Sequence, residues 1–173
     1  MDALYNTHVK LLAFDFLKLT PSPTEPSSFF RRGKRLSRAE TVGIVVTRDL
    51  KPGKFVKFTI DDGSGCISCV LWLNQLNSSY FSRRNPSDVR LIAQAATDFA
   101  SDLQLGVLAR VRGRITDYRG ALQISVSDVV VERDPNMQIL HWLDCMRSLV
   151  MLLARILDSD CSASCARICG VER

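Results

Sequence analysis

Aromatic rings and arginines are the side chains of this sequence whose positions favour binding chemistry, and together they can hold a nucleic acid. Bases of a single strand stack on aromatic rings, at about 1–3 kcal/mol per base, while basic side chains follow the phosphates. Trp72 and Tyr118 are the two candidate rings, because each precedes an expected turn at which a base could approach. Trp72 has a second interpretation, in which it caps the core or covers a contact with a partner.

A row of arginines recurs at every second position of an expected strand, so their guanidinium groups should leave the strand on one side. The row consists of Arg110, Arg112 and Arg114. Such a row suits phosphates, but a charged strand edge that resists aggregation explains the same pattern. Lys57 and Arg119 are weaker candidates, because lone charges on strands and turns usually face solvent. Phe55 either stacks on a base or packs beneath the proline-rich loop that precedes the strands.

No set of residues in the sequence has the spacing of a catalytic, cofactor or metal site. The two histidines, His8 and His141, stand near no nucleophile or acidic pair at a known motif spacing. The pair Cys66 and Cys69 falls in an expected strand, where a spacing of three residues points the two thiols to opposite faces. A phosphate-cradling Gly-Lys-Ser/Thr loop is also absent from the sequence. We therefore expect neither an enzyme nor a bound cofactor or metal.

Positive charge is concentrated near the N-terminus. The chain has a net charge of +5, and a basic cluster falls within residues 31–38. The cluster consists of Arg31, Arg32, Lys34, Arg35 and Arg38. It suits a polyanionic partner, as a phosphate-contacting arm or as a nuclear import signal, although basic runs are also common on ordinary solvated surfaces.

The N-terminal segment over residues 1–38 differs in character from the rest of the chain. An apolar stretch from Val9 to Leu19 predicts a short ordered element. The proline and serine cluster over 20–28 predicts a loop that cannot pair in a sheet and that runs into the basic cluster.

Alternating apolar and polar residues from Ala39 onward predict five strands and one helix. The expected strands are Thr41–Thr47, Lys54–Asp61, Cys66–Leu73, Val107–Tyr118 and Ala121–Glu132. Between the third and fourth strands, Pro86 opens a segment with apolar residues at helical spacing, which ends before Gly106. The residues expected to face inward are Val56, Phe58, Ile60, Ile67, Cys69, Leu71, Val111, Gly113, Ile115, Leu122, Ile124 and Val126.

Three strands, a helix and two strands in this order are typical of the OB-fold, a small five-stranded barrel whose helix plugs one end. The prediction is therefore a mainly β fold, with the barrel over residues 39–133 and a C-terminal α-helix after it. A split β-sheet packed on one helix has the same order of elements and is the alternative fold.

A helix with one apolar seam is expected over residues 134–157. Asp134 can cap this helix and Pro135 fits its first turn, where a missing N–H costs nothing. The barrel already has its own core, so the seam needs another surface to cover it. The expected partner-binding residues are Ile139, Leu140, Leu143 and Met146, and the seam continues through Val150, Leu153 and Leu157.

The C-terminal stretch is not expected to enter a membrane. Charged residues interrupt its apolar run, whereas a transmembrane helix needs about 20 mostly apolar residues. The tail over 158–173 carries three cysteines at a spacing of four, and we assign it no role. They are Cys161, Cys165 and Cys169.

Three stretches of the chain carry a likeness to a known family. They are Asp61-Asp-Gly-Ser-Gly-Cys-Ile-Ser-Cys-Val-Leu-Trp72, Val111-Arg-Gly-Arg-Ile115 and Val131-Glu-Arg-Asp-Pro-Asn136. In this order they resemble the Stn subunit (suppressor of cdc thirteen) of the CST telomere-capping complex, a family that is itself similar to the middle subunit of replication protein A. Trp72 and Tyr118 match positions at which that family has aromatic residues.

The resemblance implies an OB-fold that contacts telomeric G-rich single-stranded DNA in the nucleus and helps to cap chromosome ends. It also implies that the helix after the barrel packs on the small Ten subunit, that the large Ctc subunit docks elsewhere, and that DNA polymerase alpha-primase is recruited. Two other interpretations fit the same residues: a protein adaptor without nucleic-acid contact, and an RNA-binding OB domain attached to a translation or tRNA enzyme. A pure adaptor would not need aromatic rings and cations together on the barrel surface, which favours direct binding.

Overall fold

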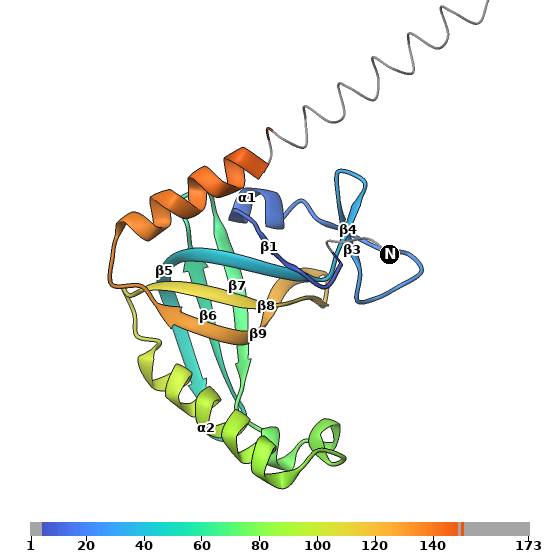
Figure 1. Ribbon diagram of the computed structural model, residues 1–173, viewed down its shortest axis with the longest axis vertical. Coiled ribbons are helices and arrows are strands. Elements are labelled where there is room, and N and C mark those ends of the chain that lie inside the picture. Colours follow the sequence, from blue (N-terminus) through green and yellow to red (C-terminus); the bar gives the residue numbers. More distant parts are fainter. Residues whose placement is uncertain (1–4, 149, 151–173) are drawn as a thin grey trace, which may run out of the picture.

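A closed five-stranded barrel forms the centre of the computed structural model, which describes residues 5–148 and 150 (Figure 1). Its strands are β5 (Arg38–Lys51), β6 (Phe55–Asp61), β7 (Cys66–Trp72), β8 (Leu108–Tyr118) and β9 (Ala121–Val131). They follow one another around the barrel in the order β5-β6-β7-β9-β8, and pairing of β5 with β8 closes it. The five predicted strands and the OB-fold are confirmed, because the helix between β7 and β8 is also in place.

Long strand β5 bends so that its first half pairs with β8 and its second half with β6. The predicted inward-facing residues are buried, apart from Leu122, which is partly buried against the core. Gly113 lets β8 approach β9 closely, since a Cβ there would lie 2.2 Å from the carbonyl oxygen of Ser125. A side chain at this position would therefore push the two strands apart.

Helix α2 (Pro86–Asp102) covers one end of the barrel (Figure 1). It begins as expected, with Pro86 in the first turn and the Asn85 side chain accepting a hydrogen bond from the backbone N–H of Ser87. Its buried side is formed by Val89, Ala96 and Ala100. Two short 3-10 helices, η1 (Gln75–Asn77) and η2 (Ser79–Phe81), connect β7 to α2.

The N-terminal segment packs against the barrel and shares its core. Its elements are β1 (His8–Lys10), α1 (Ala13–Phe16), β2 (Thr20–Pro21), β3 (Phe29–Arg31) and β4 (Lys34–Leu36). Strand β1 pairs in parallel with the start of β5, and Phe16 and Phe29 are fully buried. The prediction that the cluster over 20–28 cannot pair is wrong for its first two residues, because β2 pairs with β3. Pro21 is tolerated there at the end of a two-residue edge strand.

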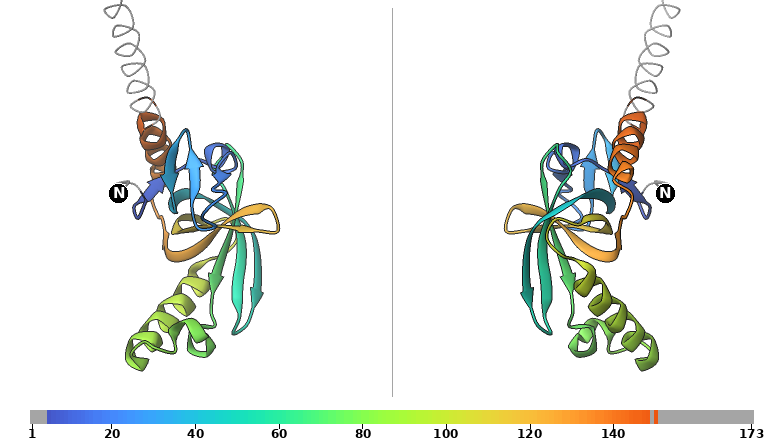
Figure 2. Two further views of the ribbon diagram at one scale, coloured as in Figure 1. Left: turned by 90° about the vertical axis from the view of Figure 1, so that its right-hand side faces the viewer. Right: turned by 90° about the vertical axis from the view of Figure 1, so that its left-hand side faces the viewer.

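Strands β3 and β4 form a hairpin around the basic cluster, which the sequence predicted as the end of a loop. Arg31 pairs with Asp15 at 2.5 Å, and Arg35 pairs with Glu25. These two arginines therefore fasten the hairpin to neighbouring elements instead of forming a free arm. Figure 2 shows the hairpin and the C-terminal helix at the end of the barrel opposite α2.

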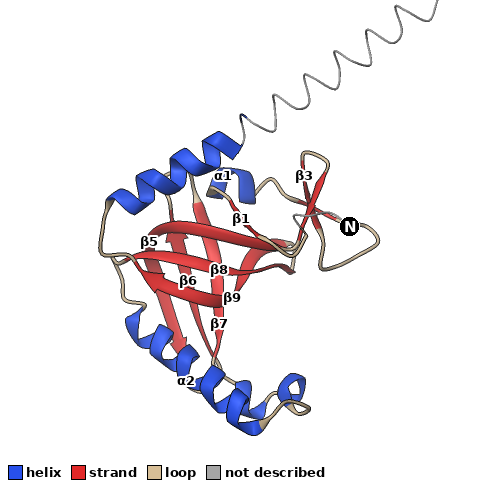
Figure 3. Ribbon diagram, viewed as in Figure 1, coloured by secondary structure: helices blue, strands red, loops and turns tan. Residues whose placement is uncertain are grey.

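The C-terminal helix begins at residue 136 and lies across the barrel end above α1 (Figure 3). Asp134 caps it as predicted, since its Oδ1 accepts a hydrogen bond of 2.9 Å from the N–H of Asn136. Among residues 5–148 and 150, no helix has both the length and the apolar content that a bilayer crossing requires.

The turn between β6 and β7 connects both terminal helices to the barrel. Asp62, 1% exposed, accepts a hydrogen bond of 2.7 Å from the N–H of Ala13 at the start of α1. Its Oδ1 accepts two more from the N–H and Oγ of Ser64, and its backbone carbonyl accepts one of 2.9 Å from Nε1 of Trp142. One buried residue thus fixes α1 and the C-terminal helix together.

We expect the docking of this helix to depend on pH through His141. Its Nε2 donates to the carbonyl oxygen of Leu11 at 3.2 Å, its side chain is buried, and burial lowers its pKa. As the pH falls below about 6.5, His141 is therefore protonated in the unfolded chain before it is protonated in the folded chain. We expect the free energy of unfolding to decrease as the pH falls from 7 to 5. Urea unfolding at pH 7 and at pH 5.5 measures this effect.

The matched variant for this experiment is His141→Gln, which can still donate to Leu11 but does not titrate. The variant should lose part of the pH dependence of stability. His8 keeps its own contribution, because partial burial and the charge of Arg38 also lower the pKa of His8. Asp144 does not interfere, because its hydrogen bond from Lys10 lowers its pKa and places its titration below this range. An unchanged pH dependence in the variant would contradict the prediction.

Candidate nucleic-acid interface

Two aromatic rings form a platform on the outer face of β6 and β7. Phe55 and Trp72 are register partners, and their ring centroids lie 5.8 Å apart in an edge-to-face arrangement of 73°. Trp72 is 45% exposed, so its ring is open to a ligand and does not cap the core. Lys51 lies opposite Phe55 on β5, with Nζ 5.3 Å from the ring centroid, and Lys57 is exposed one step farther along β6. We call these four residues the aromatic platform.

Tyr118 and Arg119 lie at the opposite end of β7 from Trp72. The parallel register of β7 with β9 places the β8–β9 turn beside Cys66, at the start of β7. Tyr118 is 55% exposed, and Arg119, with a positive φ of 56°, holds its guanidinium 5.2 Å from the tyrosine ring. With about 3.3 Å per residue, the length of β7 separates the two predicted rings by roughly 20 Å. The structure therefore places them at two ends of one face and does not bring them together.

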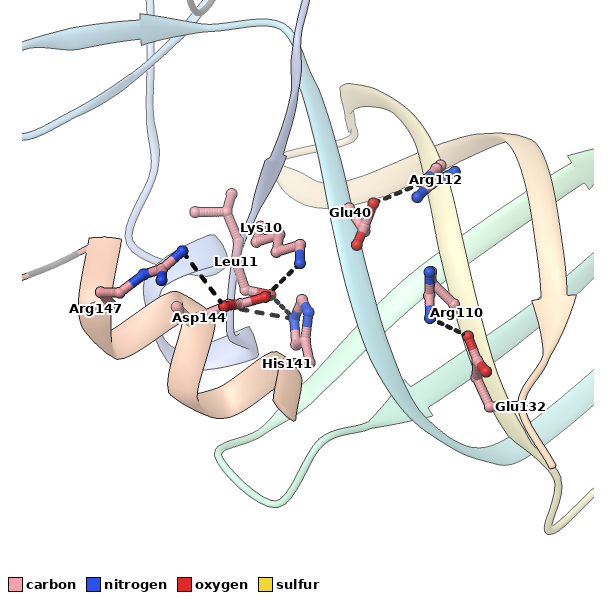
Figure 4. Close-up of polar contacts among 10 residues, drawn as sticks. Lys10, Leu11, Glu40, Arg110, Arg112, Glu132, His141, Asp144 and Arg147 are labelled. Carbon is pink, nitrogen blue, oxygen red and sulfur yellow. Dashed lines mark hydrogen bonds and ion pairs between the residues drawn. The ribbon is translucent and has the colours of Figure 1, made fainter. Parts of the chain in front are cut away.

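The predicted arginine row leaves β8 on its outer side, but two of its members are paired with acids (Figure 4). Arg110 pairs with Glu132, and Nε of Arg112 donates to Glu40 at 2.6 Å. The hydrogen bond to Glu40, which is itself buried, raises the pKa of Arg112. Arg114 is exposed and, within the described part of the chain, takes part in no ion pair. Of the row, Arg114 is thus the member whose charge is open to a phosphate.

A groove of about 790 Å³ adjoins the platform, between β7, α2 and the loop over 74–84. Trp72 and Arg38, a member of the predicted basic cluster, form part of its wall. Residues that the sequence reasoning missed form more of it, among them Tyr80, Phe81 and Arg84. We call this feature the arginine groove. The stretch Tyr80-Phe-Ser-Arg-Arg84 could have indicated this groove from the sequence, because aromatic rings beside arginines are typical of single-strand binding.

The cysteine pair Cys66 and Cys69 and the contact between Cys145 and His141 both have geometries that argue against metal binding or catalysis. Cys66 is exposed and Cys69 is buried, so their thiols point to opposite faces as predicted. Cys145 lies 3.5 Å from Nε2 of His141, which resembles a nucleophile and its base. However, Cys145 is 1% exposed, and burial raises the pKa of its thiol to about 12. The thiol therefore stays protonated and out of reach of a substrate.

Metal ligands do not converge in the described structure. Within residues 5–148 and 150, no three His, Cys, Asp or Glu side chains are arranged to hold a metal ion. The cysteines of the tail, from Cys161 to Cys169, lie outside the described residues.

An apolar seam is exposed along the C-terminal helix, on the side that faces away from the barrel. The exposed fractions are 60% for Ile139, 50% for Leu140, 58% for Leu143 and 52% for Met146. His141 and Cys145 are buried on the opposite side of the helix. These four residues are therefore available for contact with a partner, while Leu153 and Leu157 lie outside the described residues.

Sequence comparisons agree with the fold. The family model of the OB-fold nucleic acid binding domain matches residues 40–132. The chain is 53% identical over 146 residues to CST complex subunit STN1 of Arabidopsis thaliana, which covers 84% of this chain and 91% of that protein. It is 27% identical over 152 residues to CST complex subunit STN1 of Ailuropoda melanoleuca, and spans 41% of the length of that relative.

Two solved structures have the same fold. One is the S. pombe Stn1-ten1 complex, with a TM-score of 0.64 at 21% identity over 83% of this chain and 92% of the matched chain. The other is a replication protein A heterotrimer bound to ssDNA, with a TM-score of 0.64 at 19% identity over 84% of this chain and 98% of the matched chain. The comparison supports the OB-fold with its flanking elements.

Proposed function

Because this chain belongs to the STN1 family of CST complex subunits, we propose that it binds telomeric G-rich single-stranded DNA on the outer face of its barrel. The observation that carries this proposal is the aromatic platform, where Phe55 and the exposed Trp72 lie beside Lys51 and Lys57. Rings flanked by cations offer both forces that hold a single strand, stacking and phosphate attraction.

The bound DNA strand extends from the platform toward the β8–β9 turn, where Tyr118 and Arg119 form a second contact. The separation of roughly 20 Å along β7 requires several nucleotides, which agrees with the site size of about 4–16 nucleotides for an OB-fold. Lys57, which is exposed on β6, supplies a phosphate contact along the way. Arg110 and Arg112 contribute less to phosphate binding, because acids already neutralise their charge.

The C-terminal helix joins the chain to its complex. Its exposed seam suits an apolar partner helix, and one structural neighbour is a complex of Stn1 with ten1. We propose that Ile139, Leu140, Leu143 and Met146 pack on a small Ten-type subunit.

Family membership alone suggests the wider setting. We propose a nuclear protein at telomeres that meets the large Ctc subunit through another surface and supports recruitment of DNA polymerase alpha-primase. The families matched are in general not enzymes, and we propose that this chain acts by binding without catalysis.

Fluorescence anisotropy of a labelled G-rich single strand tests the proposal, with the chain alone and with its small partner. Replacing Trp72 with alanine should weaken binding about 5- to 150-fold, since the stacking of one base is lost. Raising the salt concentration should weaken binding of both forms, because phosphate contacts release counterions.

The matched control is Phe14→Ala, which removes a 55% exposed aromatic ring from α1, at the other end of the barrel. Its affinity should equal that of the unaltered chain. If the unaltered chain failed to bind with and without its partner, direct binding would be wrong, and the barrel would serve as a protein adaptor.

A further inference from the structure

The arginine groove is unusual in its charge. It is lined by eighteen residues, which include three arginines and one histidine but no aspartate or glutamate. These are the arginines at positions 38, 84 and 114 together with His8. Low-dielectric walls focus the field of such charges, so the groove attracts an anion.

Two of its arginines face one another without an acid between them. The β5–β8 register sets Arg38 directly opposite Arg114, and the β1–β5 register sets His8 beside Arg38. Like charges directly opposite on neighbouring strands repel. Among the residues that the structure describes, neither arginine forms an ion pair, in contrast to Arg110 and Arg112 farther along the same strand. A phosphate between the two guanidinium groups would turn this repulsion into two attractions.

A buried amide in the same groove has an unused acceptor. Gln75 is 7% exposed, and its Nε2 donates to the backbone carbonyl of Trp72 at 2.5 Å. Its Oε1 is buried without a hydrogen-bond partner in the described chain, a state that costs free energy unless a ligand supplies a donor. The N–H groups on the edge of a base are donors of this kind. Tyr80, 70% exposed at the groove, offers a ring on which such a base can stack.

We propose that the arginine groove holds a further nucleotide of the bound single strand, beyond the aromatic platform. Its phosphate lies between Arg38 and Arg114, and its base lies beside Tyr80 with an N–H directed at Oε1 of Gln75. Trp72 belongs to both sites, so the strand turns at this ring and enters the groove. This inference rests on the proposed function and adds a second site to it.

The test of this site measures the affinity of the full chain for G-rich single strands at several salt concentrations. The strand length is varied from about 4 to 16 nucleotides. The double variant Arg38→Gln/Arg114→Gln should bind the short strands unchanged and the longer strands more weakly. For the longer strands, the slope of log affinity against log salt should decrease in magnitude by about 0.7, because the variant loses its contact with the one phosphate that lies between the two arginines. The matched control, Arg90→Gln/Arg133→Gln, removes the same charge at positions that do not line the groove and should keep the slope.

A second variant, Tyr80→Ala, alters only an exposed side chain. It should weaken the binding of the longer strands roughly fivefold or more. If Trp72→Ala weakened binding while both groove variants behaved like the control, the groove site would be wrong and the platform would stand. If the unaltered chain bound no strand of any length, both proposals would be overturned together.

Discussion

Replacing Asp62 with alanine is expected to destabilise the chain by about 3 kcal/mol or more. The carboxylate takes the place of a capping side chain for α1, since Leu12 at the cap position can offer none. The substitution would leave the buried N–H of Ala13 without an acceptor and would remove the acceptor of the two hydrogen bonds that Ser64 donates. Each buried donor left without a partner costs about 1–3 kcal/mol. Urea unfolding at pH 7 measures the loss.

The neighbouring substitution Asp61→Ala is the matched control. Asp61 accepts one exposed hydrogen bond from the N–H of Gly63 and contacts neither terminal helix. It should change the free energy of unfolding by less than about 1 kcal/mol. Equal effects of the two substitutions would show that the Asp62 carboxylate does not hold α1 as the geometry indicates.

The second large effect is expected at the apolar seam. Replacing Leu143 and Met146 with glutamate should weaken binding of the small subunit about 100-fold or more, because two charges would be buried in an apolar contact. Both side chains are more than half exposed in the free chain, so the barrel itself should remain folded. Isothermal titration with the purified small subunit measures the loss.

Leu91→Glu provides the corresponding control on α2, where this leucine is 70% exposed at the opposite end of the barrel. It adds a charge to an exposed apolar position and should leave partner binding intact. Unchanged binding in the double seam variant would assign the small subunit to another surface. Circular dichroism of each variant separates lost binding from lost folding.

The barrel was predictable because its pattern is local. Alternation along a strand sorts side chains between two faces, so Val56, Phe58 and Ile60 could be assigned to the core from their spacing alone. The same rule placed Trp72 on the opposite face of its strand, but the alternative that its ring caps the core was decided by the structure, in which the ring is exposed. The glycines between β6 and β7 indicated a turn, but not that Asp62 within it would fasten two distant helices.

The features of the fold and of the site that could not be predicted depend on contacts between residues far apart in the sequence. Spacing placed Arg110 and Arg112 on one side of β8, yet only the closed barrel brings Glu132 and Glu40 to them. The arginine groove was not predicted for the same reason, because Arg38 and Tyr80 come to line one groove only after the sheet has closed. The pairing of β1 with β5 was equally hidden, since a strand of three residues with one apolar side chain, Val9, is too short to indicate a register.

Closure of the barrel through β5 and β8 has a consequence for synthesis of the protein. Residue 38 pairs with residue 114, so β5 leaves the ribosome long before its partner is made. In the meantime its unpaired edge is available for pairing with other chains. Non-local pairing of this kind also folds slowly, on the scale of milliseconds to seconds. A nascent chain would therefore benefit from a chaperone until β8 emerges, and expression at lower temperature should raise the soluble yield.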